Sequence, residues 1–351
     1  MAYFRKTFAI DLGTTSVLVF SRSQGVLLNE PSVVAIDSYS DSILAVGQEA
    51  KDMLGRTPGN IIAHRPMRDG VIADYRATEA MLKYFIRKSS GRTLLKPDVI
   101  ICIPSQASQV QKRAVLQASS AAGSHNTYLI EEPLAAAIGC GLDISDPGGH
   151  LIVDIGGGTT DVALISLGSI VLSKSIDVAG DEFDQSITDY IRHKFNIVIG
   201  EKTAEDIKIK VGSSLQETED TIEVKGRSLI DGLPVHVYIS SRDIVDALER
   251  PIKTIIDAIH EVLMHTPPEL SADIYDRGIL LSGGGSLIRD LNSHIEERLG
   301  VDVHYAEHPI TAVVRGTGKA LSWISKLKSG DEILSENTKK KIQQKESLRK
   351  R

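Results

Sequence analysis

Three glycine-rich turns bring together residue types that could bind a phosphorylated ligand. They are DLGTTS (residues 11–16), DIGGGTTD (154–161) and LSGGGSL (281–287). Small residues let backbone N–H groups approach an anion closely, and threonine or serine hydroxyls add further hydrogen-bond donors. A single turn of this kind is more often structural than functional, so the ligand site is indicated by the three together. The spacing matches neither the Walker-type phosphate loop nor an early dinucleotide-binding fingerprint.

The first two turns are each flanked by apolar, β-rich runs. FAIDLGTTSVLVF covers residues 8–20, and LIVDIGGGTTDVALISL covers residues 151–167. Two to four glycine or threonine residues between such runs predict a β-hairpin. Two similar hairpins about 140 residues apart predict a duplicated lobe with the ligand between the two copies.

The third turn differs because GILLSGGGSL runs from a buried strand into the helix-like LIRDLNSHIEERLG. The glycines at 283–285 would then lie at a strand-to-helix turn, where a helix N-terminus favours a flat or anionic ligand. Between the turns, the sequence predicts a strand over 98–104, a helix that ends at Gly123, a short strand from Thr127 and a helix after Pro133. This alternation predicts an α/β fold with a largely parallel core sheet.

The composition excludes several other classes of protein. Of 351 residues, 42% are hydrophobic and 25% are charged, as expected for a soluble protein with two hydrophobic cores. No apolar stretch approaches the roughly 20 residues that span a bilayer. The two cysteines lie in apolar surroundings and predict no zinc site, and the net charge of -6 gives no general case for nucleic acid.

The last 26 residues, 326–351, have a different charge balance from the rest of the chain. They contain nine Lys or Arg and four Asp or Glu, so this tail carries about +5. It has no pattern for a buried face, and we expect a frayed helix or disorder. It would either touch anionic lipid or a partner, or be a solvated terminus without a role.

The three turns, in this order, resemble the two phosphate motifs and the adenosine motif of the actin, heat-shock chaperone and sugar kinase superfamily. Within it the chain resembles MreB and Mbl, on segments that run up to about residue 325. They include NEPSVVAID, RPMRDGVIADY, LIEEPLAAAIG, TAEDIKIKVG, TPPELSADIYDRG and VVRGTGKAL. The stretches RTPGNI and TAEDIKIKV lean toward the Mbl branch.

The resemblance implies a fold and a division of the chain. The fold is α/β and actin-like, with two ATPase lobes, each a mixed, mostly parallel sheet flanked by helices. Lobe I would span 1–145 with a small inserted subdomain at about 33–66, and lobe II 146–310 with one at about 181–243. A return helix (311–325) and a basic flexible tail (326–351) would follow.

The resemblance also implies a site for ATP and Mg²⁺. The β- and γ-phosphates would lie among Gly13, Thr14, Thr15, Ser16, Gly157, Gly158 and Thr159. Many relatives have DLGTAN at the first turn, so Thr15 and Ser16 depart from that pattern. Asp11 and Asp154 would hold Mg²⁺ through its water shell. The adenosine would contact Gly180, Asp181, Glu205, Asp206, Ile207, Lys208, Ser282, Gly283, Gly284 and Gly285.

For hydrolysis, the resemblance assigns Glu132 to polarising the attacking water and Thr160 to placing it. The residues alone leave another interpretation open, because two glutamates before a proline also suit the first turn of a helix. The implied activity is a slow ATPase coupled to polymerisation. Phosphoryl transfer leaves little covalent work to a protein, so positioning and charge neutralisation should account for most of the rate.

The resemblance further implies a homopolymer of paired protofilaments on the inner face of the cytoplasmic membrane. The protein would be cytoplasmic and peripheral, would work with the cell-wall elongation machinery and would help set rod shape. Leu94 and Leu95, between Arg92 and Lys96, would insert into the membrane interface. Alternatively, the two leucines pack inward before the strand that begins at Asp98.

Three other functions use the same kind of clamp. A small-molecule kinase would need a catalytic aspartate where this chain has LIEEP. A chaperone ATPase would need a separate peptide-binding domain after the ATPase lobes. A nucleotide-dependent scaffold that does not polymerise fits the sequence as well.

Overall fold

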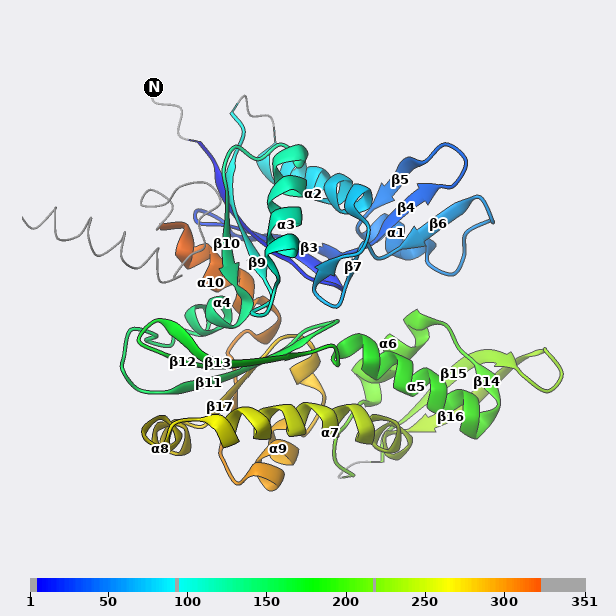
Figure 1. Cartoon of the computed structure of the whole chain (residues 1–351). Helices are drawn as coiled ribbons and strands as arrows, with labels where there is room; N and C mark the ends of the chain where they lie inside the picture. Colours follow the sequence, from blue (N-terminus) through cyan, green and yellow to red (C-terminus); the bar gives the residue numbers. More distant parts are fainter. Residues whose placement is uncertain (1–4, 92–94, 217–218, 323–351) are drawn as a thin grey trace, which may run out of the picture.

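Two five-stranded sheets with the same strand order form the centres of two lobes (Figure 1). The computed structural model describes residues 5–91, 95–216 and 219–322. The first sheet has the order β10-β9-β1-β2-β3, and the second, taken from its other edge, has β18-β17-β11-β12-β13. In each sheet the central strand, β1 or β11, has its hairpin partner on one side. On its other side lie parallel strands from later in the chain.

The strands of the first sheet are β1 (Thr7–Leu12), β2 (Ser16–Ser21), β3 (Gly25–Pro31), β9 (Asp98–Ile103) and β10 (Thr127–Glu131). Those of the second are β11 (His150–Ile155), β12 (Thr160–Ser166), β13 (Ser169–Ile176), β17 (Ile279–Ser282) and β18 (Val303–Tyr305). β1 and β11 are antiparallel to their hairpin partners and parallel to β9 and β17. Both predicted hairpins are confirmed, and each sheet is half parallel and half antiparallel instead of mostly parallel.

Helices cover the outer faces of both sheets and fill the space between them. The helices are α2 (Tyr75–Ser90), α3 (Gln109–Ala122), α4 (Glu132–Gly139), α5 (Gly180–Phe195), α7 (Ser241–His265), α8 (Pro268–Arg277), α9 (Leu291–Leu299) and α10 (Ala312–Ala320), with single 3₁₀ turns η1 (Gly285–Leu287) and η2 (Pro309–Thr311). One core lies between the first sheet and α2 and α3. Another contains side chains of both sheets together with α4 and α10, so these two helices lie between the lobes (Figure 1).

The crossing of α4 and α10 is closely packed because small residues meet there. A Cβ atom added at Gly139 would lie 1.9 Å from the carbonyl oxygen of Ala312, and one added at Gly316 would lie 1.7 Å from that of Ala135. Real Cβ atoms do not approach backbone so closely, so only glycine fits at either position. Because α10 packs on the first sheet and α4 packs on the second as well as on the first, this crossing joins the two lobes.

Two small subdomains extend from the same side of the molecule, at the right of Figure 1. One holds the sheet β5-β4-β6 with β4 (Val34–Asp37), β5 (Ser42–Val46), β6 (Ile61–His64) and α1 (Gln48–Met53). The other holds β14 (Ile197–Val198), β15 (Thr221–Ser228), β16 (Pro234–Ser240) and α6 (Glu201–Val211). A short hairpin of β7 (Met67–Arg68) and β8 (Val71–Ile72) follows the first subdomain.

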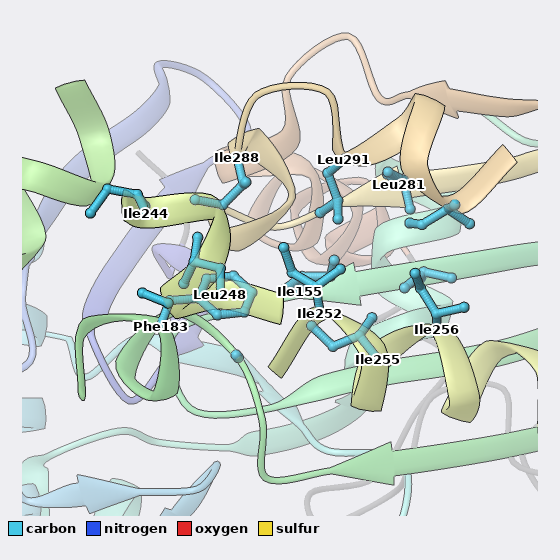
Figure 2. Close-up of a cluster of buried hydrophobic side chains, with 14 of the residues drawn as sticks. Ile155, Phe183, Ile244, Leu248, Ile252, Ile255, Ile256, Leu281, Ile288 and Leu291 are labelled. Atoms are coloured by element: carbon cyan, nitrogen blue, oxygen red, sulfur yellow. The ribbon is translucent and has the colours of Figure 1, made fainter. Parts of the chain in front are cut away.

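Helix α7 organises the core of lobe II. It begins with a capping box in which Ser240 and Asp243 satisfy each other's backbone N–H groups. Figure 2 shows Leu248, Ile252 and Ile255 of its apolar stripe pointing toward the end of β11. Because successive strand residues face opposite sides, this packing fixes Ile155 on the core side and leaves Asp154 on the other.

None of the helices in the described part of the chain is both long enough and apolar enough to cross a membrane. The basic tail at 326–351 and the end of the expected return helix lie outside the described residues.

Candidate ligand site between the lobes

A cavity of about 600 Å³ lies between the lobes, where the three glycine turns meet. Most of the predicted site residues line it, namely Asp11, Gly13, Thr14, Thr15, Ser16, Glu132, Asp154, Gly157, Gly158, Thr159, Gly180, Asp181, Glu205, Lys208, Gly283, Gly284 and Gly285. They come from strand ends and turns of both sheets and from the helices α4, α5 and α6, so the site exists only when the two lobes face each other.

The two hairpin turns touch across this cavity. A Cβ atom at Gly157 would lie 1.7 Å from Oγ1 of Thr15, and one at Gly158 would lie 2.6 Å from Oγ1 of Thr14. The first turn is closed by a hydrogen bond of 3.1 Å from the N–H of Gly13 to the carbonyl oxygen of Ser16. The glycines thus permit the close approach that a ligand held from both sides requires.

Carboxylates collect beneath the turns. Burial raises the pKa of Asp11 to about 7, and the charge of Asp154 adds to the effect. Burial also raises the pKa of Asp154 to about 6, although Ser282 donates a short hydrogen bond to it. Among the described residues that line the cavity, the only cations are Lys51 and Lys208, and both already pair with other acids. The acids at this end therefore lack a positive partner, which suits a divalent cation.

Glu132 is the first residue of α4 and lines the cavity. The helix begins there, one residue before Pro133, and not after the proline as the sequence predicted. Burial raises the pKa of Glu132 well above its usual range, and the charges of Asp161, Asp11 and Asp154 add to this. An acid in this setting can accept a proton from a water molecule, so the position fits the expected role.

The structure does not bring Thr160 to the cavity, and this expectation is corrected. Thr160 is fully buried, and its hydroxyl donates a 2.6 Å hydrogen bond to the carbonyl oxygen of Val178. It pairs with Ile155, which faces the core of lobe II, so it points the same way. Thr159 lines the cavity in its place. The two-residue alternation along the strand was the signal that could have separated these threonines.

Asp161 is a buried acid that the sequence reasoning missed as a site residue. It lies directly opposite Asp154 in the β11–β12 ladder, and Ser175 lies opposite it on β13. Burial raises its pKa, while hydrogen bonds from Ser105, Ser175 and Thr159 hold that pKa down. The same alternation places Asp161 on the face of Asp154, so a pattern argument could have found it.

Exposed apolar side chains also line the cavity. Ile209, Leu287 and Ile310 line it with 73%, 53% and 48% of their surfaces exposed, which is high for such side chains. On α6, Glu205 and Lys208 also face the cavity, but two expected contacts do not. Ile207 is buried in the core of lobe II, and Asp206 is exposed away from the lining. Helical spacing explains this, since residues three or four apart share a face.

The third turn differs from the expected strand-to-helix turn. After β17, Gly285–Leu287 form only a 3₁₀ turn, and α9 begins at Leu291. Ser282 does not line the cavity, because its hydroxyl donates to Asp154. Gly283 has φ +83° and lies where a Cβ atom would be 2.1 Å from the carbonyl oxygen of Ile155. The turn therefore offers bare backbone to a ligand and no α-helix N-terminus.

Ion pairs join the two small subdomains at the mouth of the cavity. Lys51 Nζ of α1 lies 2.7 Å from Glu205 Oε2 of α6, and Arg65 Nη2 lies 2.5 Å from Glu201 Oε1. Thr15 donates a 3.2 Å hydrogen bond to Asp181 farther in. These contacts hold the lobes together on the side away from the α4–α10 crossing, and no local sequence pattern indicates them.

Of the two leucines of the expected membrane loop, the structure describes only Leu95. Leu94 lies outside the described residues, and Leu95 is half-buried.

A family model and curated relatives that match this chain all carry the names MreB or Mbl. Residues 5–329 match the family model described as MreB/Mbl protein. The cell shape-determining protein Mbl of Bacillus subtilis is 48% identical, over 92% of this chain and 98% of that protein. The cell shape-determining protein MreB of Escherichia coli K12 is 46% identical, over 95% of this chain and 97% of that protein.

Solved structures of actin-like proteins have the same fold as this chain. The crystal structure of MreB5 of Spiroplasma citri bound to ADP has a TM-score of 0.88 and 39% identity, over 92% of this chain and 98% of that one. A MamK double helical filament has a TM-score of 0.78 over 91% of this chain and 99% of that one. At 23% identity, the likeness to MamK establishes the fold alone.

Proposed function

The chain belongs to the MreB/Mbl family of actin-like, cell shape-determining proteins, and from this premise we propose that it binds ATP and polymerises into membrane-associated filaments. One observation carries the proposal: a cavity between two lobes is lined by three glycine turns, by acids and by exposed apolar side chains. A nucleotide combines charged phosphates with a flat base, and this lining suits both parts.

The residues present fit a nucleotide with Mg²⁺. The hairpin turns supply backbone N–H groups for the phosphates, and the hydroxyl of Thr14, which accepts from the N–H of Gly70, can donate to them as well. Asp11 and Asp154 are the acids that would hold Mg²⁺ through its water shell, since Mg²⁺ usually keeps several waters. Ile209, Leu287 and Ile310 would cover the base. The ADP bound to the S. citri relative supports this assignment.

We assign hydrolysis to residues at the phosphate end. The oxygen of a water molecule would add to the γ-phosphorus while the bond to the β–γ bridging oxygen breaks, its electron pair leaving with ADP. The carboxylate of Glu132 would accept the proton of the water, and the hydroxyl of Thr159 would help place it. Mg²⁺, when bound, supplies neutralisation of the charge that develops on the phosphates. The proposed activity is a slow ATPase that is coupled to polymerisation.

Polymerisation is proposed from the family and from the fold, which a MamK double helical filament shares. We propose a homopolymer of paired protofilaments on the inner face of the cytoplasmic membrane. It would work with the cell-wall elongation machinery and help set rod shape, as the description of the Mbl and MreB relatives as shape-determining supports. Leu94 and Leu95 stay the proposed membrane contact, repeated along a filament so that weak single contacts add up.

Sedimentation of the purified protein tests this function. The expected result is that wild type pellets with Mg-ATP, alone and with liposomes that contain anionic lipid. Glu132→Ala should still assemble but release little phosphate, and Leu94→Ser/Leu95→Ser should assemble but lose the liposomes. Binding of ATP without sedimentation under any condition would overturn the filament proposal and favour a kinase or a non-polymerising scaffold.

A further inference from the structure

One row of polar side chains crosses four adjacent strands of the sheet of lobe II. It consists of Ser175, Asp161, Asp154 and Ser282, which are register partners on the adjacent strands β13, β12, β11 and β17. Cross-strand partners lie about 5 Å apart on the same face, so these four side chains are in reach of one another. Ser282 hydrogen-bonds Asp154, and Ser175 hydrogen-bonds Asp161. The proposed reaction uses Asp154 and leaves Asp161 without a role.

Asp161 also accepts a hydrogen bond from lobe I. Ser105, in the loop after β9, donates a hydrogen bond of 2.9 Å from its hydroxyl to Oδ1 of Asp161. Asp161 is 1% exposed and does not line the cavity, so it does not touch the ligand. A buried acid that takes a donor from the opposite lobe depends on the two lobes being closed against each other.

Asp161 also reaches two residues of the proposed reaction. The hydroxyl of Thr159, which does line the cavity, lies close enough to Asp161 to lower the pKa of that acid. Its charge acts on Glu132, second only to burial among the influences on that acid. One carboxylate thus connects a residue of the opposite lobe with the two residues that would hold and deprotonate the water.

We propose that Asp161 is a positioning residue for ATP hydrolysis, which orients the hydroxyl of Thr159 beside Glu132 when Ser105 of the closed lobe I binds it. This rests on the proposed function and names one part of its mechanism. With the lobes apart, Asp161 loses the Ser105 donor, and the Thr159 hydroxyl loses its fixed orientation. Hydrolysis is thereby restricted to the closed molecule. Asp161 acts through Thr159 and Glu132 and not on the nucleotide itself.

A neighbouring hydrogen bond provides the matched control. Gln106, the next residue of the same loop, donates a 3.3 Å hydrogen bond from Nε2 to the carbonyl oxygen of Ser173 on β13. This bond also joins the two lobes, but it is exposed and does not involve Asp161. If the loop only holds the lobes together, loss of either bond should have the same effect.

The experiment compares wild type with Ser105→Ala, Ser105→Thr, Gln106→Ala and Asp161→Asn. The rate of phosphate release in a single turnover of Mg-ATP gives the chemical step, and titration with a fluorescent, non-hydrolysable ATP analogue gives the Kd. Thermal unfolding shows whether each variant is folded. Ser105→Thr keeps a hydroxyl, and Ser105→Ala avoids the buried site if Asp161→Asn does not fold.

Ser105→Ala and Asp161→Asn should slow the chemical step by about tenfold to a hundredfold, as small misplacements in active sites do, with the Kd unchanged. Ser105→Thr should restore most of the rate, and Gln106→Ala should keep it. Equal losses in Ser105→Ala and Gln106→Ala, or an unchanged rate in Ser105→Ala, overturn the proposal. If wild type itself binds no ATP or releases no phosphate, the proposed function fails, which is a different result.

Discussion

Asp11 and Asp154 occupy the same position in the two lobes, each as the fifth residue of the central strand of its sheet. Each strand then continues into a glycine turn and its hairpin partner. The charge of Asp154 contributes to the raised pKa of Asp11. The duplicated topology therefore delivers two like charges to one place, and that arrangement is unfavourable until a cation is bound.

Asp11→Asn should stabilise the ligand-free protein at alkaline pH. The pKa of Asp11 is raised from 3.8 to about 7, so between these values the folded state binds a proton that the unfolded state releases. The free energy of unfolding therefore falls as the pH rises through this window, and the asparagine variant lacks this loss. In larger domains each kcal/mol shifts the Tm by about 2–4 °C.

Thermal unfolding without Mg²⁺ and nucleotide checks this prediction, at about pH 5 and about pH 8, on either side of the raised pKa. The Tm advantage of Asp11→Asn should be small at the lower pH and larger at the higher one. Asp206→Asn, an exposed acid on α6, serves as the control. An advantage of the same size at both values would show that the charge of Asp11 is not its cause.

Leu287→Ser or Ile310→Ser should weaken nucleotide binding. About half of each side chain is exposed in the lining of the cavity, and a base seated against it would bury it. Burying half of such a side chain contributes about 1 kcal/mol, or about fivefold in Kd. Titration with a fluorescent nucleotide measures the change. Ile230→Ser, on the β15–β16 hairpin and 84% exposed, should leave the Kd as it is, and parallel losses in all three would contradict the placement.

Lys51→Ala should accelerate the release of nucleotide. Lys51 and Glu205 join the small subdomains across the mouth of the cavity, and both are about one-fifth exposed. Pairs of this kind contribute about 0.2–1 kcal/mol, so the expected change is at most about fivefold. Stopped-flow displacement of a fluorescent ADP measures it. The reversed pair Lys51→Glu/Glu205→Lys should release nucleotide more slowly than either single reversal, and additive effects would show that the two residues do not interact.

Gly316→Ala should destabilise the whole protein. The added methyl group would lie 1.7 Å from the carbonyl oxygen of Ala135, in the crossing that joins the lobes. Overpacking of this kind costs about 1–3 kcal/mol or more, because backbone has to move. Urea unfolding measures the loss. Gly59→Ala, where no atom lies within 4 Å of the added group, is the control, and a smaller loss at Gly316 than at Gly59 would be incompatible with the packing.

Local pattern was sufficient for much of the fold. Apolar runs and glycine turns predict the strand β9, the end of helix α3 at Gly123 and both hairpins. These features depend on residues close in sequence, which is why they could be predicted. The proportion of parallel strands could not, since the neighbour of each strand is chosen by the packing of segments far apart in the chain.

In the site, too, features within one continuous segment could be predicted, and features that depend on packing could not. Its glycine turns are visible in the sequence because each turn is a continuous segment. The roles of neighbouring residues such as Thr159 and Thr160, or Ile207 and Lys208, depend on which face of a strand or helix meets the cavity. The partners of Asp161 and Lys51 come from the opposite lobe, and nothing near them in the sequence indicates such contacts.

The two lobes have matching sheets, turns and aspartates, so these shared features alone do not set the orientation of a bound ligand. The paired turns and aspartates would grip a chain of phosphates equally well in either direction. The features that the lobes do not share would set the orientation of a bound nucleotide, namely Glu132 at the start of α4 in lobe I and the apolar side chains of Ile209 on α6 and Leu287 in η1 of lobe II. Substitutions that make the two lobes more alike would therefore preserve phosphate binding but not the single orientation of the nucleotide that hydrolysis requires.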